Sequence, residues 1–213
     1  PLKLPYGIMN FKSIRTEGYL YVDKTRYIET LENGAKYPFF VRPRCFGKSL
    51  FLSLLKYYYD EIYAPLFSFL FNDLYIGKHP TPLKNSRQVL SLDFSGLNTE
   101  SKEAFKESFR ENLISQIVRF IYEREKLFSF LVPDQFAEKL QAIKDIRVLM
   151  ETLFLQFERT GKPLFLLIDE YDHFANDILA MGDSSSSYKE LVQSRGFVRD
   201  FYARLQIGTK SII

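Results

Sequence analysis

The chain has 213 residues, 46% of them hydrophobic and 26% charged, with a formal net charge of +3. These values are typical of a globular protein with a sizeable core, and they exclude a disordered chain. The small net charge gives no argument by itself for a nucleic-acid or membrane partner. A single cysteine excludes an internal disulfide, and the two histidines lack metal-ligand spacing. We therefore expect one main domain in a reducing, cytoplasmic compartment, without a membrane partner.

The first part of the chain predicts a helix, a strand, a loop and a second helix. Asp23 is a suitable helix N-cap, apolar residues follow it at helical spacing, and Gly34 ends the pattern. Residues 37–41 form a compact apolar run that predicts a strand. The loop 42–49 follows at once and leads into a helix with apolar residues at helical spacing.

The middle of the chain predicts one strand and two long helical segments. Residues 72–86 contain several glycine, proline and asparagine residues and predict an irregular connection. Residues 87–93 predict a strand that ends in a carboxylate. A helix is expected over 99–128 and another over 134–157, the second interrupted near Lys144–Asp145.

The last part of the chain predicts a buried strand and a further helix. Residues 164–168 form a continuous apolar run, typical of a strand buried on both faces. A helix is expected over 188–205, and residues 211–213 resemble the start of another strand. Because parallel strands need crossover connections, the alternation of strands and helices predicts an α/β fold with a mostly parallel sheet and helices on both faces.

Gly47, Lys48 and Ser49 lie between the first predicted strand and its helix, which is where a phosphate-binding loop requires them. Backbone amides at a helix N-terminus and the helix macrodipole both attract phosphate oxygens. Lys48 would neutralise the phosphates of a nucleotide, the Ser49 hydroxyl would bind Mg²⁺, and Gly47 would let the backbone approach closely. These three residues match the last three positions of a Walker A motif.

The strict pattern needs a glycine five positions before Gly47, and that position is Arg42. A surface turn before a basic helix would explain the triplet equally well if it stood alone. Arg42 and Arg44 are either bidentate phosphate donors or anchors of the loop to nearby carboxylates. Cys45 is either a buried filler or a thiol activated by its basic neighbours.

Asp169 and Glu170 follow the apolar run 164–168. They favour a phosphate loop over a surface turn at residues 47–49, because they would supply the Walker B half of a nucleotide site. Asp169 would bind the metal directly or through water, and Glu170 would polarise an attacking water. The alternative is an ordinary strand end with solvated carboxylates. Asp93 is a second-tier candidate, since it either caps a turn or lies near the nucleotide.

Five segments of the sequence match one pattern: LPYGIMNFKSIR at 4–15, YLYVDKTRYIETL at 19–31, FFVRPRCFGKSLFLSLLKYYYD at 39–60, VLSLDFSGL at 89–97 and PLFLLIDEYDHF at 163–174. Together they resemble the bacterial AAA-ATPase-like family, whose members often carry a C-terminal domain similar to PD-(D/E)XK nucleases. The resemblance implies a P-loop NTPase with ATP and Mg²⁺ as cofactors. It also implies a sensor strand, a helical lid and a nuclease-like partner domain beyond residue 213.

The resemblance divides the chain into residues 1–35, an N-terminal segment and helix near the adenine, and residues 36–213, the ATPase core. Tyr21 is accordingly a candidate adenine contact. The family's loop begins Arg-Pro-Arg, so Arg42 is a family feature, whereas Cys45 stands where the family usually has arginine. The candidate cofactor-binding residues of the loop are Arg42, Pro43, Arg44, Cys45, Phe46, Gly47, Lys48, Ser49 and Leu50.

The leading hypothesis is an ATP-binding domain that hydrolyses ATP with Mg²⁺ and so switches a C-terminal effector domain. Whether this stretch of chain turns over ATP by itself is left open. The alternative is a non-hydrolysing interaction module with structural nucleotide or none, which the surplus of 21 Phe and 14 Tyr would suit if they covered a surface. A core rich in aromatic residues is the other explanation. Nucleic-acid binding has only the slight positive charge and the nuclease-like partner in its favour.

Overall fold

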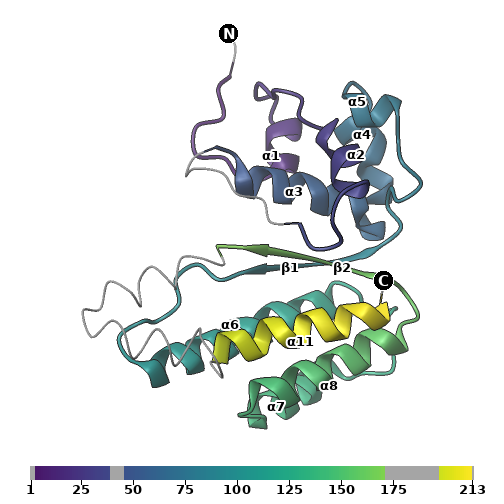
Figure 1. Ribbon diagram of the computed structural model, residues 1–213. Coiled ribbons are helices and arrows are strands. Elements are labelled where there is room, and N and C mark those ends of the chain that lie inside the picture. The colour runs from purple at the N-terminus through teal and green to yellow at the C-terminus, as the bar shows by residue number, and fades with distance from the viewer. Residues whose placement is uncertain (1–2, 39–45, 171–196, 213) are drawn as a thin grey trace. The chain divides into compact units, whose positions relative to one another are not determined.

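The computed structural model describes residues 3–38, 46–170 and 197–212 (Figure 1). The chain divides into two compact units, Pro1–Val89 and Leu90–Ile213, and each is described by itself. Together they form a mixed structure of helices and strands, compatible with the predicted α/β class. The predicted strand at 37–41 falls mostly outside the described residues.

The described part of the first unit is built from short helices around α3. Phe11 at the start of α1 donates its backbone N–H to the Ser53 hydroxyl of α3, at 2.9 Å. Its ring contacts Tyr21 edge-on at 5.2 Å, and Phe71 at 5.1 Å. The helices are α1 (Phe11–Thr16), α2 (Tyr27–Glu32), α3 (Lys48–Tyr59), the 3-10 helix η1 (Glu61–Leu66), α4 (Phe67–Phe71) and α5 (Tyr75–Lys78).

Two predictions for this unit need correction. The structure has α5 inside the connection 72–86, which was expected to be irregular. Side chains about fifty residues away cap this short helix: Asp23 accepts the Tyr75 N–H at 2.8 Å, and Thr25 accepts the Ile76 N–H at 3.1 Å. Asp23 is therefore not the N-cap of α2, a position that Arg26 occupies.

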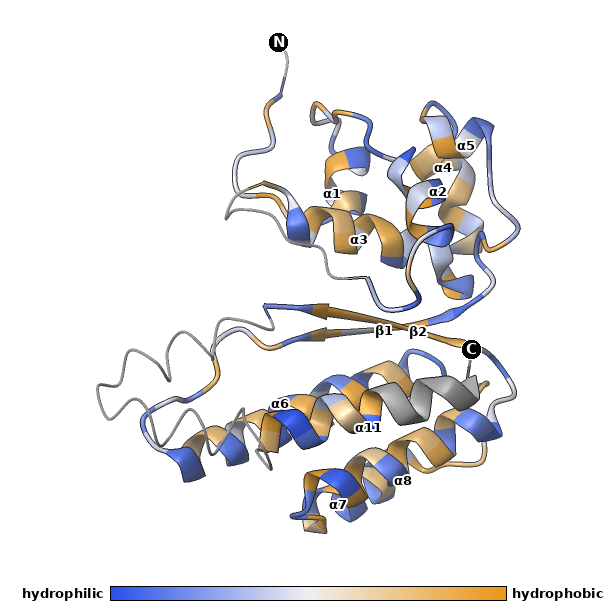
Figure 2. Cartoon of the chain, in the orientation of Figure 1, coloured by the Kyte–Doolittle hydropathy of each residue, from blue (hydrophilic) through white to orange (hydrophobic). Residues whose placement is uncertain are grey.

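In the described part of the second unit, two parallel strands lie against long helices (Figure 1). The strands are β1 (Gln88–Asp93), whose first two residues precede the boundary at 89, and β2 (Leu164–Asp169). The strands predicted at 87–93 and 164–168 are confirmed. The interruption predicted near Lys144–Asp145 is confirmed as well, because it separates two helices. Figure 2 shows β2 as a nearly continuous hydrophobic segment, as its apolar run predicted. The helices are α6 (Lys102–Tyr122), α7 (Pro133–Ala142), α8 (Ile146–Arg159) and α11 (Phe197–Ile212).

The helix α11 continues to Ile212, so the strand expected to start at Ser211 is wrong for the residues described. Val198, Phe201 and Leu205 are buried at helical spacing, and this amphipathic pattern sustains the helix. Arg204 pairs with Glu151 of α8 at 2.7 Å. The predicted start of this helix near residue 188 lies outside the described residues.

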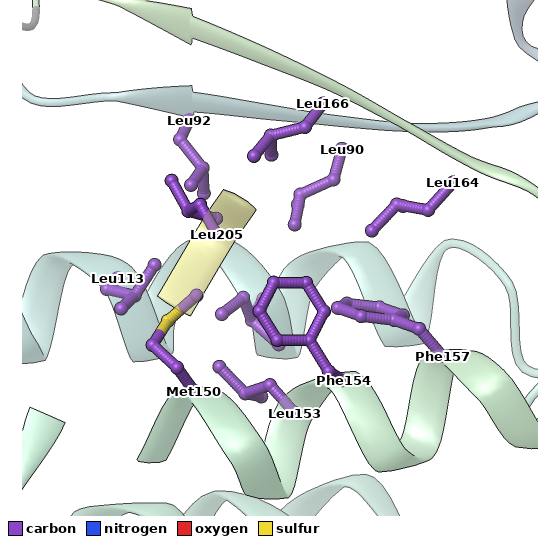
Figure 3. Close-up of a pocket in the computed structure, with 11 residues that line it drawn as sticks. Leu90, Leu92, Leu113, Met150, Leu153, Phe154, Phe157, Leu164, Leu166 and Leu205 are labelled. Atoms are coloured by element: carbon purple, nitrogen blue, oxygen red, sulfur yellow. The ribbon is translucent and has the colours of Figure 1, made fainter. Parts of the chain in front are cut away.

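Aromatic side chains fill much of the core of the second unit, in agreement with the core explanation for the phenylalanine surplus. Phe94 stacks on Phe109 of α6 with ring centroids 4.5 Å apart, and Phe201 of α11 contacts Phe94 edge-on at 5.7 Å. Figure 3 shows strand side chains such as Leu90 and Leu164 pointing toward α8. The gap between them is about 10 Å³ and lined by apolar side chains, so it is a packing defect of the core rather than a ligand site.

A substitution at Gly77 tests the packing of α5 against α4. A Cβ at this position would lie 1.8 Å from the Phe71 carbonyl oxygen, a backbone atom that cannot rotate away. We expect Gly77→Ala to destabilise the protein by several kcal/mol or to prevent folding. The added methyl group would overpack this contact, and moving α5 away to relieve the clash would lose its packing contacts. Gly18→Ala is the matched control, because no atom lies within 4 Å and only its left-handed backbone (φ +70) is penalised, by about 1 kcal/mol. Urea unfolding measures both; equal midpoints would contradict the packing.

Candidate functional site

The described part of the phosphate loop begins at Phe46, whose side chain is 62% exposed. Gly47 is the N-cap of α3 and has a left-handed backbone (φ 77, ψ 28), a conformation that favours glycine. Its carbonyl accepts the Phe51 N–H at 3.0 Å, the first hydrogen bond of the helix. Lys48, Ser49 and Leu50 are half-buried in the first turn. The remaining candidates, Arg42, Pro43, Arg44 and Cys45, lie outside the described residues.

The start of α3 is arranged in favour of a negatively charged ligand. In the described structure, no side chain caps Gly47, and the first turn contains no Asp or Glu. Lys48 occupies the first helical position, where a positive charge opposes the macrodipole and costs a few tenths of a kcal/mol. An anion bound there would use the first N–H groups of the helix and offset that cost.

The acidic candidates of the second unit lie together. Because β1 and β2 are parallel, their carboxyl ends meet at one edge, and the Phe94 N–H donates to the Asp169 carbonyl at 3.3 Å. Asp93 is exposed there, whereas Asp169 and Glu170 are half-buried. We call Asp93, Asp169 and Glu170 the acidic edge.

Each carboxylate of the two strands is oriented by a local backbone amide. Asp169 Oδ1 accepts the Glu170 N–H at 3.0 Å, and Asp93 Oδ1 accepts the Ser95 N–H at 2.8 Å. Glu170 has a left-handed backbone (φ 52), a conformation that costs a residue with a side chain about 1 kcal/mol or more. Glu170 directly follows the end of β2.

The sequence interpretation missed two polar residues of α6, of which Gln116 contacts this edge and Asn112 contacts Gln116. Gln116 Oε1 accepts the Asp93 N–H at 2.8 Å, and Gln116 Nε2 donates to the Asp93 carbonyl at 2.9 Å. Gln116 Nε2 also donates to Asn112 Oδ1, one turn earlier. Polar residues at positions i and i+4, beside the buried Leu113 and Ile117, are the sequence signal that could have indicated them.

The segment 21–25, expected near an adenine, is held by contacts within the first unit. Tyr21 packs on Phe11, and burial raises the pKa of its hydroxyl. Asp23 Oδ1 accepts hydrogen bonds from the Thr25 N–H and hydroxyl, and Oδ2 accepts the Tyr75 N–H. Although desolvation alone would raise the pKa of Asp23, these hydrogen bonds lower it below its ordinary value. The adenine contact of Tyr21 stays a prediction.

The lowered pKa of Asp23 predicts a pH-dependent contribution to stability. A carboxyl group with a lowered folded-state pKa stabilises above its unfolded pKa of about 3.9, and the contribution is lost as the pH falls through the folded value. We expect Asp23→Ala to lower the free energy of unfolding at pH 7 by about 1–3 kcal/mol, since two backbone donors lose their acceptor. The difference from wild type should shrink toward pH 3. Glu17→Ala, which removes an exposed partner of Lys3, should cost below about 0.5 kcal/mol; equal losses would contradict the cap.

Comparisons with known proteins bear on this geometry. A family described as predicted AAA-ATPase matches residues 5–213. The chain belongs to this family. The resemblance inferred from the sequence is thereby confirmed, and membership of the predicted AAA-ATPase family supports nucleotide binding and an ATPase-like character.

A partial match to an individual protein adds little to the family assignment. The chain is 49% identical over 70 residues to an uncharacterized protein in the vnfD 5' region of Azotobacter chroococcum mcd 1, a match that covers 30% of this chain and 13% of that protein. No solved structure matches. Within the described ranges, no helix is long and apolar enough to cross a bilayer, and no cluster of three or more His, Cys, Asp or Glu side chains could hold a metal.

Proposed function

We propose that this member of the predicted AAA-ATPase family binds ATP, with Gly47, Lys48 and Ser49 on the phosphates. The observation that carries the proposal is the start of α3: a left-handed glycine N-cap, followed by Lys48 and Ser49 in an uncapped first turn. Such a turn presents backbone N–H groups and a positive charge to an anion. Arg42 and Arg44, which immediately precede it in the sequence, would add positive charge.

Mg²⁺ fits the available donors. Magnesium in nucleotide sites keeps several waters and takes only one or two protein oxygens besides the phosphates, so it needs no cage of three side chains. Ser49 supplies a hydroxyl oxygen, and Asp169 supplies a half-buried carboxylate with one oxygen already oriented by a backbone amide. When bound, the ion would neutralise charge on the phosphates.

Hydrolysis would require a group that orients water, and Glu170 is our candidate. It follows Asp169 directly and is half-buried. We propose that binding and hydrolysis of ATP switch a C-terminal effector domain, an idea whose support is the family resemblance alone. Tyr21 stays a proposed adenine contact, and Asp93 a proposed second carboxylate at the nucleotide.

Removing the Lys48 charge tests nucleotide binding. Lys48→Ala should weaken ATP binding at least tenfold, because the side chain that neutralises the phosphates is lost. Lys78→Ala removes an exposed positive charge from the same unit and should leave the affinity within twofold. Isothermal titration calorimetry measures both, at the same ionic strength. Equal affinities in wild type and Lys48→Ala would refute the proposal.

Replacing Glu170 by Gln separates hydrolysis from binding. The amide keeps the size of the side chain but is a poor base, so ATP turnover should fall about 10² to 10⁴-fold while ATP affinity stays within about threefold. Glu158→Gln on the exposed face of α8 is the matched control and should keep wild-type turnover. Phosphate release reports the rate. Binding without any turnover, unaffected by Glu170→Gln, would favour the non-hydrolysing interaction module.

A further inference from the structure

The side chain of Gln116 pairs with the backbone of Asp93 in the way that a neighbouring strand would. The N–H and C=O of one strand residue point to the same side, and Gln116 satisfies both, at 2.8 and 2.9 Å. The next residue, Phe94, directs its N–H to the opposite side and donates it to Asp169. The carboxyl end of β1 is thus held from both sides, by β2 and by α6.

Asn112 fixes the orientation of the Gln116 amide. Gln116 Nε2 donates to both the Asp93 carbonyl and Asn112 Oδ1, which leaves Oε1 to accept the Asp93 N–H. A flipped amide would direct its oxygen at two acceptors and its NH₂ at a donor. Both side chains are half-buried on the same face of α6, one turn apart, so the pair is a built arrangement rather than a transient surface contact.

An amide is the side-chain type that suits this position. It donates and accepts at one planar group, which a lysine or a carboxylate cannot do. It is also neutral, so it adds no further negative charge to the acidic edge. The contact therefore holds the Asp93 backbone at the end of β1 without changing the charge of the acidic edge.

We propose that Gln116, oriented by Asn112, is a positioning residue that holds Asp93 beside Asp169 so that the acidic edge can bind a magnesium nucleotide. The inference rests on the proposed function, which supplies the ligand. Gln116 acts through Asp93 and does not itself touch the nucleotide. Groups that orient a metal ligand from behind commonly change metal affinity 10- to 100-fold when removed.

The test compares the magnesium dependence of ATP binding in Gln116→Ala and wild type. The Mg²⁺ concentration that half-saturates binding at fixed ATP should rise about tenfold in Gln116→Ala. ATP affinity in EDTA, which depends on the start of α3, should stay within twofold. Amide hydrogen exchange at Asp93 in the nucleotide-free protein should become faster. Ser115→Ala, an exposed neighbour on α6, is the matched control and should behave as wild type.

A purely structural Gln116 would lower the unfolding midpoint without moving the Mg²⁺ midpoint, and that result would overturn the inference. If Gln116→Ala does not fold, Asn112→Ala decides: a severalfold rise in its Mg²⁺ midpoint supports the inference, and an unchanged midpoint overturns it. Failure of the proposed function is a different outcome, recognised when Lys48→Ala leaves ATP binding in EDTA unchanged.

Discussion

The parallel pairing of β1 with β2 is the constraint on which the acidic edge depends. Parallel strands end at the same edge, so Asp93 and Asp169 are neighbours although 75 residues separate them in the sequence. The pairing is stabilised from one side by apolar strand residues that pack on α8 and by the aromatic stack of Phe94 on Phe109. The Gln116 amide binds the Asp93 backbone on the side of β1 that faces away from β2. Burial of the apolar strand residues thus sets the register of β1 against β2. That register places Asp93 and Asp169 at the same edge of the sheet.

The start of α3 depends on a different constraint, the left-handed backbone of Gly47. That conformation turns the chain into the helix and leaves its first N–H groups without a side-chain cap in the described structure. An uncapped helix start with Lys48 in its first turn is unfavourable in isolation. The cost is acceptable in a protein that binds an anion there, which is why we regard the local electrostatics of α3 as the main structural support for nucleotide binding.

The sequence predicted the features that local patterns determine. A continuous apolar run marked β2, a shorter run ending in a carboxylate marked β1, and the interruption predicted near Lys144–Asp145 separates α7 from α8. The features that it missed depend on distant partners: α5 is capped by Asp23 and Thr25, and Gln116 binds the end of a strand 23 residues away. The motif residues of the site were identifiable by type, because glycine, lysine and acidic residues have specific roles. The hydrogen bonds that orient them follow from tertiary packing, which no local pattern contains.

Our central proposal is that the start of α3 and the acidic edge act on one nucleotide, and an NMR titration of the protein with ATP and Mg²⁺ tests it most directly. The account predicts that the amide signals of Gly47, Lys48 and Ser49 shift together with those of Asp169 and Glu170, with a single midpoint. In EDTA the first group should shift and the second should move little. Shifts confined to one group in the presence of Mg²⁺, or different midpoints for the two, would contradict the claim.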